Sequence, residues 1–219
     1  MSLPKGHGSG RSSFIAGDAS SMPNDAELSR TLVATQREAS LCTMTSDGFP
    51  YGSAVSYVDD ATGAPILLIS EMAEHTINAR GDNRVSILVT PVEKTHGGTV
   101  TATRLTLVGR LHMIKDPGQD RVSYIEGHPD AASYADFNDF SFWRLQIYRC
   151  RYIGGFGCMS WVTPAEYSSA KPDLMCDIAE SIIARMNADY EDANLLQVQV
   201  LAGLRNASKA SVINIDRCG

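Results

Sequence analysis

Short apolar runs separated by turn residues dominate the chain between residues 39 and 162. The run "PILLIS" at 65–70 is almost wholly apolar, and "RVSILV" at 84–89 is similar. An apolar run of this length between turn signals is typical of a buried strand. Between two earlier runs lies Asp47-Gly48, which is a strong hairpin signal. Strand periodicity therefore dominates this part of the chain.

Two longer stretches continue the strand pattern. The segment "GGTVTATRLTLVGRLHMI" at 97–114 is rich in β-branched residues and roughly alternates. The segment "DFSFWRLQIYRCRYIGGFGCMSWV" at 139–162 predicts two strands joined near Tyr148 to Arg151. At least six strands at short spacing favour a closed or nearly closed antiparallel barrel.

Helical spacing appears in only a few places. Asn24 can cap a helix, and Glu27 three residues later completes a capping-box pattern. Residues 71–81 predict a short helix. Residues 116–137 look helical, with Pro117 at a permitted early position. We expect these helices to cap the ends of a barrel formed by residues 24–165.

The composition changes on both sides of the barrel segment. Residues 1–23 are rich in Gly and Ser and have no apolar centre, which argues against a secretory signal and predicts a mobile arm. Residues 163–173 contain two prolines and predict a linker. Residues 173–219 then predict a small helical and strand domain, in which "ANLLQVQVLAGLR" fits a helix better than a strand and "ASVINID" fits a strand. A unit of this size is small for an independent fold, so we expect a satellite packed on the barrel or a domain that is cut short.

Charge and composition exclude several classes of function. The net charge of −6 argues against broad nucleic-acid binding, and no run approaches the roughly 20 apolar residues of a membrane span. The 5 cysteines are scattered without a CxxC pair, which indicates reduced thiols in a cytoplasmic protein. No HxxxH, HExxH or GxSxG pattern is present, so the sequence assigns neither a metal site nor a catalytic residue.

One short polar segment interrupts the apolar pattern and raises the question of a ligand. The strand ending at Ser70 runs directly into a helix that carries His75, Thr76 and Asn78. A helix that only covers a core does not need this cluster, whereas a phosphate is bound well by hydroxyl groups and backbone N–H donors at a helix start. Two plainer interpretations stay open, with Ser70 as a helix N-cap and His75 as a hydrogen-bonded structural residue.

Three further features could belong to the same ligand site. Arg104 and Thr106 project to one face of a strand and present a guanidinium and a hydroxyl together, although Arg104 could equally pair with a surface carboxylate. Ser53 adds another hydroxyl. The glycines of "RYIGGFGCMSWV" predict either a barrel corner or a wall for a planar ligand. Possible stacking partners there are Tyr152, Phe156 and Trp161.

In this order the segments resemble the pyridoxamine 5′-phosphate oxidase-related, FMN-binding split-barrel proteins, and more narrowly the HugZ-like haem-utilisation subgroup with a small C-terminal domain. The resemblance rests on "TMTSDGFPYGSAVSYVDDATGAPILLISEMAEHTINARGDNRVSILV", "TRLTLVGR" and "RYIGGFGCMSWV". It implies a six-stranded antiparallel split β-barrel with capping helices and a small α/β C-terminal unit. It also implies a homodimer with ligand clefts between the subunits. The residues that would fall on or near the flavin are Ser53, Ser70, His75, Thr76, Asn78, Arg104 and Thr106.

The chain departs from the pattern of the subgroup at three positions. Thr103 stands where the subgroup usually has Pro before the Arg of "RLTL". The tail reads "RMNADY" where the subgroup usually reads "HMNADH", so Arg185 and Tyr190 replace two histidines. If those histidines contact haem or a metal in relatives, this chain lacks that contact.

Three functions follow from the resemblance. The one we favour is an FMN-dependent oxidoreductase of unknown substrate, in which the flavin carries the redox chemistry. The second is a haem-binding or haem-degrading protein, whose iron would need an axial ligand. The histidines available in the folded part are His75, His96, His112 and His128. The third is a non-catalytic binding or regulatory protein that has lost the flavin.

Overall fold

The computed structural model describes residues 22–91, 102–155, 158–176, 178–213, 215 and 217. The chain divides into two compact units, one containing Asp25–Pro172 and the other Asp173–Gly219, and each is described by itself. Most of the arm expected at 1–23, the start of the strand expected at 97–114, His96 and Phe156 lie outside the described residues.

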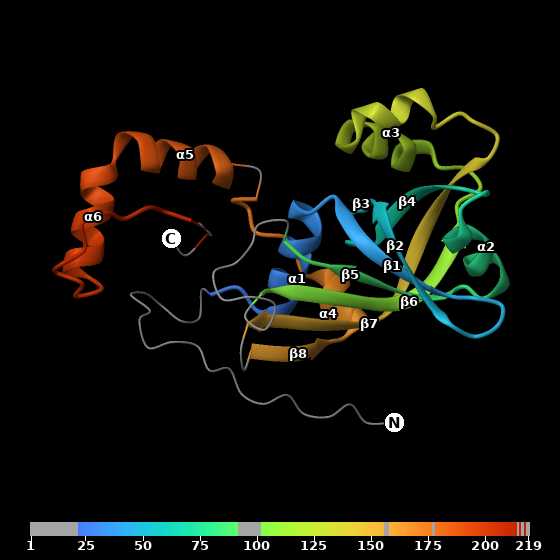
Figure 1. The fold of residues 1–219 in the computed structure, drawn as a ribbon, viewed down its shortest axis with the longest axis horizontal. Coiled ribbons are helices and arrows are strands. Elements are labelled where there is room, and N and C mark those ends of the chain that lie inside the picture. Colours follow the sequence, from blue (N-terminus) through green and yellow to red (C-terminus); the bar gives the residue numbers. More distant parts are fainter. Residues whose placement is uncertain are drawn as a thin grey trace. The chain divides into compact units, whose positions relative to one another are not determined.

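The first unit is built on one curled antiparallel sheet (Figure 1). Its strands in the described residues are β1 (Glu38–Met44), β2 (Pro50–Ser56), β3 (Val58–Asp59), β4 (Pro65–Ser70), β5 (Arg84–Val89), β6 (Arg104–Met113), β7 (Phe140–Gly155) and β8 (Cys158–Val162). They follow the order β2-β1-β5-β6-β7-β4-β3, and β8 also pairs with β7. The antiparallel split barrel expected from the sequence is confirmed, with an 8-stranded sheet where six strands were expected.

β7 holds the barrel together because it has three partners. β6 pairs with one edge of β7 over most of its length. β4 pairs with the start of the other edge, up to Arg144, and β8 pairs with the end of that edge from Cys150. The prediction of two strands joined near Tyr148 to Arg151 is wrong, because a register shift there bends β7 without ending it.

The core is a row of apolar side chains on one face of the sheet. Leu41, Ile87, Leu107, Cys150 and Val162 lie directly opposite one another across β1, β5, β6, β7 and β8, and all five are buried. Directly opposed residues in antiparallel strands point to the same face. This face is therefore the inside of the barrel, and residues one position away along each strand lie on its outer face.

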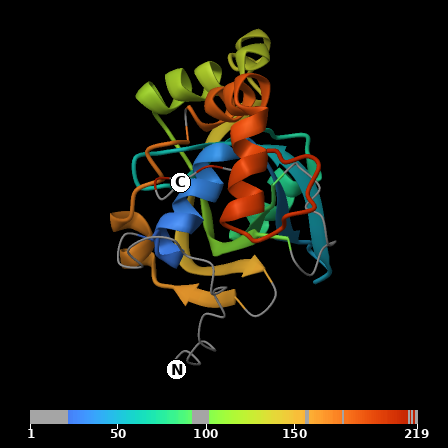
Figure 2. The ribbon, with the colours of Figure 1, turned by 90° about the vertical axis from the view of Figure 1, so that its left-hand side faces the viewer.

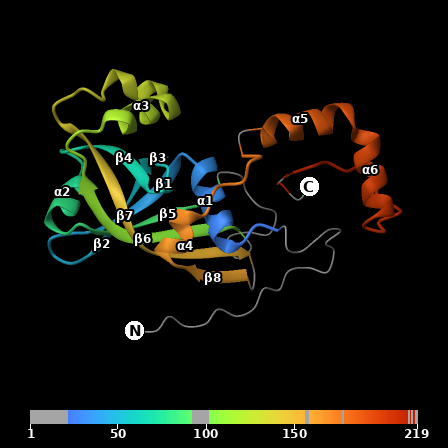
Figure 3. The ribbon, with the colours of Figure 1, turned by 180° about the vertical axis from the view of Figure 1, so that it is seen from behind.

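Helices cover the barrel at several points. In the described residues they are α1 (Asp25–Thr35), α2 (Glu74–Gly81), α3 (Gly118–Gly127), a 3-10 helix (Pro129–Ser133) and α4 (Pro164–Ser169). Seen from behind, α4 lies beside β7 (Figure 3). α3 packs near β3 and β4 over a second apolar cluster that contains Tyr124, Ile66 and Phe142.

The segment expected to be a linker, residues 163–173, contains α4, so that prediction is wrong. Thr163 and Glu166 form a reciprocal capping box, in which Glu166 N–H donates to Thr163 Oγ1 at 3.2 Å and Thr163 N–H donates to Glu166 Oε2 at 2.8 Å. Tyr167 is buried and donates its hydroxyl to the Gly63 carbonyl at 2.8 Å. The segment is therefore packed against the barrel.

The second unit contains α5 (Ala179–Asp189) and α6 (Glu191–Val200), which meet at a sharp bend (Figures 1 and 2). The helix expected for "ANLLQVQVLAGLR" is confirmed. The strand expected for "ASVINID" is not present in its described part. The backbone N–H and C=O of Val212 are instead hydrogen-bonded to the Asn187 side chain, each at 2.8 Å, and not to a neighbouring strand. Within the described ranges, no helix in either unit has the length and apolar character needed to cross a membrane.

Candidate functional site

Of the residues predicted around α2, Asn78 is hydrogen-bonded to the barrel. Asn78 Nδ2 donates to Thr43 Oγ1 at 3.1 Å, and both side chains are buried. Ser53 lies directly opposite Leu41 of β1, so its side chain is on the inner face next to this pair. The pair ties α2 to the barrel, which accounts for Asn78 without a ligand.

Ser70 is held by a different partner. Its hydroxyl donates to Asp139 Oδ2 at 2.7 Å and accepts from Met72 N–H at 3.1 Å. The N-cap of α2 is Ala73, which makes no side-chain capping bond. The alternative of Ser70 as the N-cap is therefore wrong in position, although Ser70 does fix the turn that precedes the helix.

His75 and Thr76 are enclosed by the protein. Thr76 is fully buried, and its hydroxyl has no hydrogen-bond partner among the described residues. His75 is half-buried and its Nε2 is enclosed, also without a partner in the described part. Burial lowers the pKa of His75, because desolvation disfavours the imidazolium. This histidine is therefore a poor cationic partner for a phosphate at neutral pH.

Arg104 and Thr106 lie on the outer face of the sheet. Thr106 is directly opposite Leu88 of β5 and Arg151 of β7, in the row next to the core row. Arg104 NH1 donates to the Ala102 carbonyl at 3.1 Å. Within one chain the sheet therefore lies between these two residues on one side and Ser53 with the Asn78–Thr43 pair on the other.

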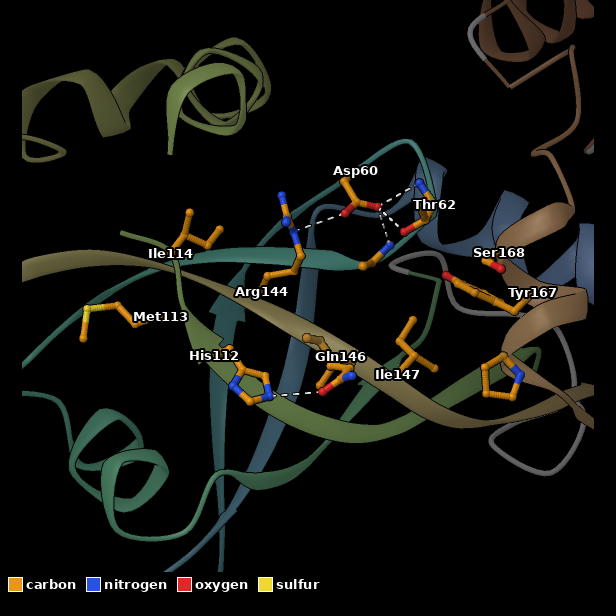
Figure 4. Close-up of a pocket in the computed structure, with 13 residues that line it drawn as sticks. Asp60, Thr62, His112, Met113, Ile114, Arg144, Gln146, Ile147, Tyr167 and Ser168 are labelled. Carbon is orange, nitrogen blue, oxygen red and sulfur yellow. Dashed lines mark hydrogen bonds and ion pairs between the residues drawn. The ribbon is translucent and has the colours of Figure 1, made fainter. Parts of the chain in front are cut away.

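A pocket that the sequence did not single out lies beside β7, in the gap between β4 and β8 (Figure 4). Its volume is about 580 Å³, which is within the usual range for small-molecule sites. Apolar side chains supply much of its wall, including Met113, Ile114, Leu145, Ile147 and Tyr167. The split in the barrel thus opens a largely apolar pocket in a single chain.

An ion-pair cluster fixes one side of this pocket. Arg144 Nε is 3.2 Å from Asp60 Oδ2, and its NH2 is 2.6 Å from Asp120 Oδ2. Asp60 Oδ1 also accepts from the N–H groups of Thr62 and Ala64, at 2.8 and 3.0 Å. Figure 4 shows Arg144 turned toward Asp60. The guanidinium is therefore committed to two carboxylates.

His112 also lines the pocket, and it lies directly opposite Arg144 across β6 and β7 (Figure 4). It is exposed, and its Nε2 is 3.2 Å from Gln146 Oε1. His128 instead places Nε2 at 2.9 Å from the Tyr57 carbonyl, and neither His75 nor His128 lines this pocket. Among the described histidines, His112 therefore combines an exposed ring with a position on the pocket wall. From the sequence, His112 was one of four histidines that could bind iron, and nothing in the sequence indicated which residues surround it in the fold.

The fold and the sequence define a family for this chain. The family model described as "CREG, beta-barrel" matches residues 20–169, and the chain belongs to this family. The resemblance to split barrels related to pyridoxamine 5′-phosphate oxidase and to the haem-utilisation proteins is confirmed.

Three known proteins are similar to this chain. A chloroplastic non-canonical heme oxygenase of Arabidopsis thaliana, HOZ, is 30% identical in an alignment of 201 residues that covers 85% of this chain and 60% of that protein. A heme-binding protein of Mycobacterium smegmatis is 32% identical with a TM-score of 0.70, covering 90% of this chain and 81% of that one. A pyridoxinephosphate oxidase family protein of Clostridium acetobutylicum is 13% identical with a TM-score of 0.53, covering 66% and 99%, and shares the fold alone.

Proposed function

We propose that this protein binds haem in the pocket of Figure 4, with His112 as the axial ligand. The observation that carries the proposal is an exposed imidazole on the wall of a largely apolar pocket in one chain. Iron in haem is commonly held by a histidine on one side of the macrocycle. The names of the plant and mycobacterial relatives, a heme oxygenase and a heme-binding protein, support the same ligand.

The residues of the pocket fit a flat apolar group. Met113, Ile114 and Ile147 offer apolar contact area, and the volume of about 580 Å³ is that of a small-molecule site. Arg144 is already paired with Asp60 and Asp120. We therefore assign the binding to the apolar walls and His112 and not to a charge contact from Arg144.

Gln146 has the position of an orienting residue for His112. In the tautomer that donates Nε2–H to Gln146 Oε1, the lone pair is on Nδ1 and is available to a metal. Such outer partners fix the ring orientation of a ligating histidine. Bound haem would supply a redox-active iron to this site, and haem degradation would require this binding first.

Absorbance titration of the purified protein with haemin tests the proposal. The wild type is expected to take up one haemin per chain with a sharp Soret band. His112→Ala should lose this band, with recovery on adding free imidazole, and Gln146→Ala should weaken uptake about tenfold. His75→Ala is the matched control, because His75 does not line the pocket. A wild-type spectrum from His112→Ala, or no uptake by the wild type, would overturn the proposal.

The competing proposal is an FMN-dependent oxidoreductase in a homodimer. Its support is the split-barrel fold, but Ser70 and Asn78 already bond to Asp139 and Thr43. Arg104 lies on the far face of the sheet, so a second subunit would have to complete the phosphate site. A parallel titration with FMN decides between them: stoichiometric uptake of FMN and none of haemin would favour the flavin. Indifference to both ligands would favour a binding or regulatory protein.

A further inference from the structure

A groove of about 430 Å³ runs over β1, β5, β6 and β7 on the outer face of the barrel. It shares no lining residue with the pocket of Figure 4. Three arginines, Arg84, Arg110 and Arg149, line the groove together with Tyr148 and Met44. Both latter side chains are exposed. The groove is therefore a separate surface with a strongly basic lining.

A β-bulge gives the groove its shape. Val108 pairs with Arg149 while Gly109 pairs with Ile147, which leaves Tyr148 as the extra residue of β7. A Cβ on Gly109 would lie 2.0 Å from the Gln146 carbonyl oxygen, so only glycine allows this close approach of β6 and β7. Bulges bend the strand and often redirect a side chain beside a functional site. Here the bulge leaves Tyr148 on the rim of the groove.

The positive charges in the groove are only partly balanced by the protein, since Asp82 is the one carboxylate paired with them in the described residues. Arg84 lies directly opposite Arg110 across β5 and β6, an arrangement in which like charges repel. Arg84 is paired with Asp82, with Nε at 2.9 Å from Oδ1, but Arg110 NH1 bonds to the neutral Asn83 side chain at 2.7 Å.

Arg149 adds a third guanidinium. It lies over the Trp161 ring, 5.9 Å from the ring centroid, and has no ion pair within the described ranges. Three guanidiniums and one carboxylate leave an excess of two positive charges in a chain whose net charge is −6. An unbalanced basic surface on an acidic protein concentrates anions.

We propose that this groove is a second binding site, for a phosphorylated small molecule with a flat organic part. Arg110 and Arg149 bind the phosphate groups, and the flat part lies against Tyr148 and Met44. The planar fork of a guanidinium matches phosphate oxygens with two parallel hydrogen bonds. Such an anion also relieves the repulsion between Arg84 and Arg110.

Titration with ADP tests the site, and binding is measured by isothermal titration calorimetry and by tryptophan fluorescence. Trp161 reports on the groove because Arg149 lies over its ring, whereas Trp143 is buried. The wild type is expected to bind one ADP per chain with a change in emission. Arg149→Ala and Arg110→Ala should each weaken binding about tenfold or more. The matched control is Arg185→Ala, since Arg185 is an exposed arginine of α5 that is paired with Asp189.

The choice of variants keeps the test independent of folding. Arg110→Ala removes a hydrogen bond to Asn83, so it is interpreted only if its thermal midpoint equals that of the wild type. If Arg110→Ala is destabilised, the test rests on Arg149→Ala, because the Arg149 side chain makes only the contact with the Trp161 ring in the described part. No saturable ADP binding by the wild type, unchanged affinity in Arg149→Ala, or an equal loss in Arg185→Ala would overturn the proposal. Inorganic pyrophosphate should compete with ADP, and failure to compete would also overturn it.

Discussion

Replacing Gly63 with alanine should remove much of the stability of the barrel. Gly63 has φ +81, and a Cβ there would lie 2.3 Å from Arg30 Nε and 2.6 Å from Arg30 Cδ. These atoms are in the middle of a side chain that is only 3% exposed. The guanidinium donates to the carbonyls of Ala170 and Ala61, at 2.9 and 3.2 Å. The new methyl group must therefore displace Arg30 from both partners.

The size of the effect follows from two terms. A left-handed backbone conformation costs a non-glycine residue ~1–2 kcal/mol. Each hydrogen bond to a charged group is worth ~1.5–3 kcal/mol, and Arg30 loses two of them. We expect Gly63→Ala to lower the free energy of unfolding by ~4–8 kcal/mol, which is comparable to the whole stability of many domains.

Urea unfolding followed by the emission of the buried Trp143 measures this effect. Gly48→Ala is the matched control, because Gly48 has φ +89 and nothing lies within 4 Å of its Cβ position. It should lose only the backbone term of ~1–2 kcal/mol. In an Arg30→Ala background, Gly63→Ala should also lose only this term. Equal losses from Gly63→Ala and Gly48→Ala would refute the reasoning.

Two further predictions concern α2. Asn78→Ala should lower the free energy of unfolding by ~1–3 kcal/mol, because it leaves the buried hydroxyl of Thr43 without its donor; the loss should shrink in a Thr43→Val background, and an equal loss there would contradict the assignment. Burial lowers the pKa of His75 below 6.5, so the unfolded chain binds the proton more readily. The stability from neutral His75 is complete above pH 6.5 and is lost as the pH falls toward its folded pKa. Thermal midpoints from pH 7.5 to 5 should fall less in His75→Gln than in the wild type, and parallel curves would count against this.

The sequence predicts the strands well because their apolar runs are local signals. It fails at α4, where two prolines outweighed the capping-box pattern of Thr163 and Glu166, which the sequence does contain. The contact that packs α4 was invisible, since Tyr167 bonds to the carbonyl of Gly63, 104 residues away. A buried tyrosine in a polar segment is defined only by its distant partner.

The bulges in β7 show the same limit. The glycines of "RYIGG" correctly predict a bulge, since the register of β7 with β8 shifts between Ile153 and Gly155. No such cluster marks the second bulge, which lies at Tyr148, opposite Gly109 of β6. Its cause is the close approach of Gly109 to the Gln146 carbonyl, which belongs to the neighbouring strand. Alternation along one strand placed Arg104 and Thr106 on a common face, but only the register of the whole sheet identifies that face as the outer one.

The register also separates the two ligand proposals by the number of chains that each one needs. A flavin phosphate bound by both Ser53 and Arg104 requires groups from opposite faces of one sheet. A single barrel cannot present both to one ligand, so FMN binding through this set requires a second subunit that brings its outer face to the α2 end of the first. The pocket at His112 is complete in one chain, since all its lining residues lie within Asp25–Pro172. Haemin binding through His112 should therefore keep the same affinity when the protein is diluted below the concentration at which any dimer dissociates, whereas FMN binding should be lost with the dimer.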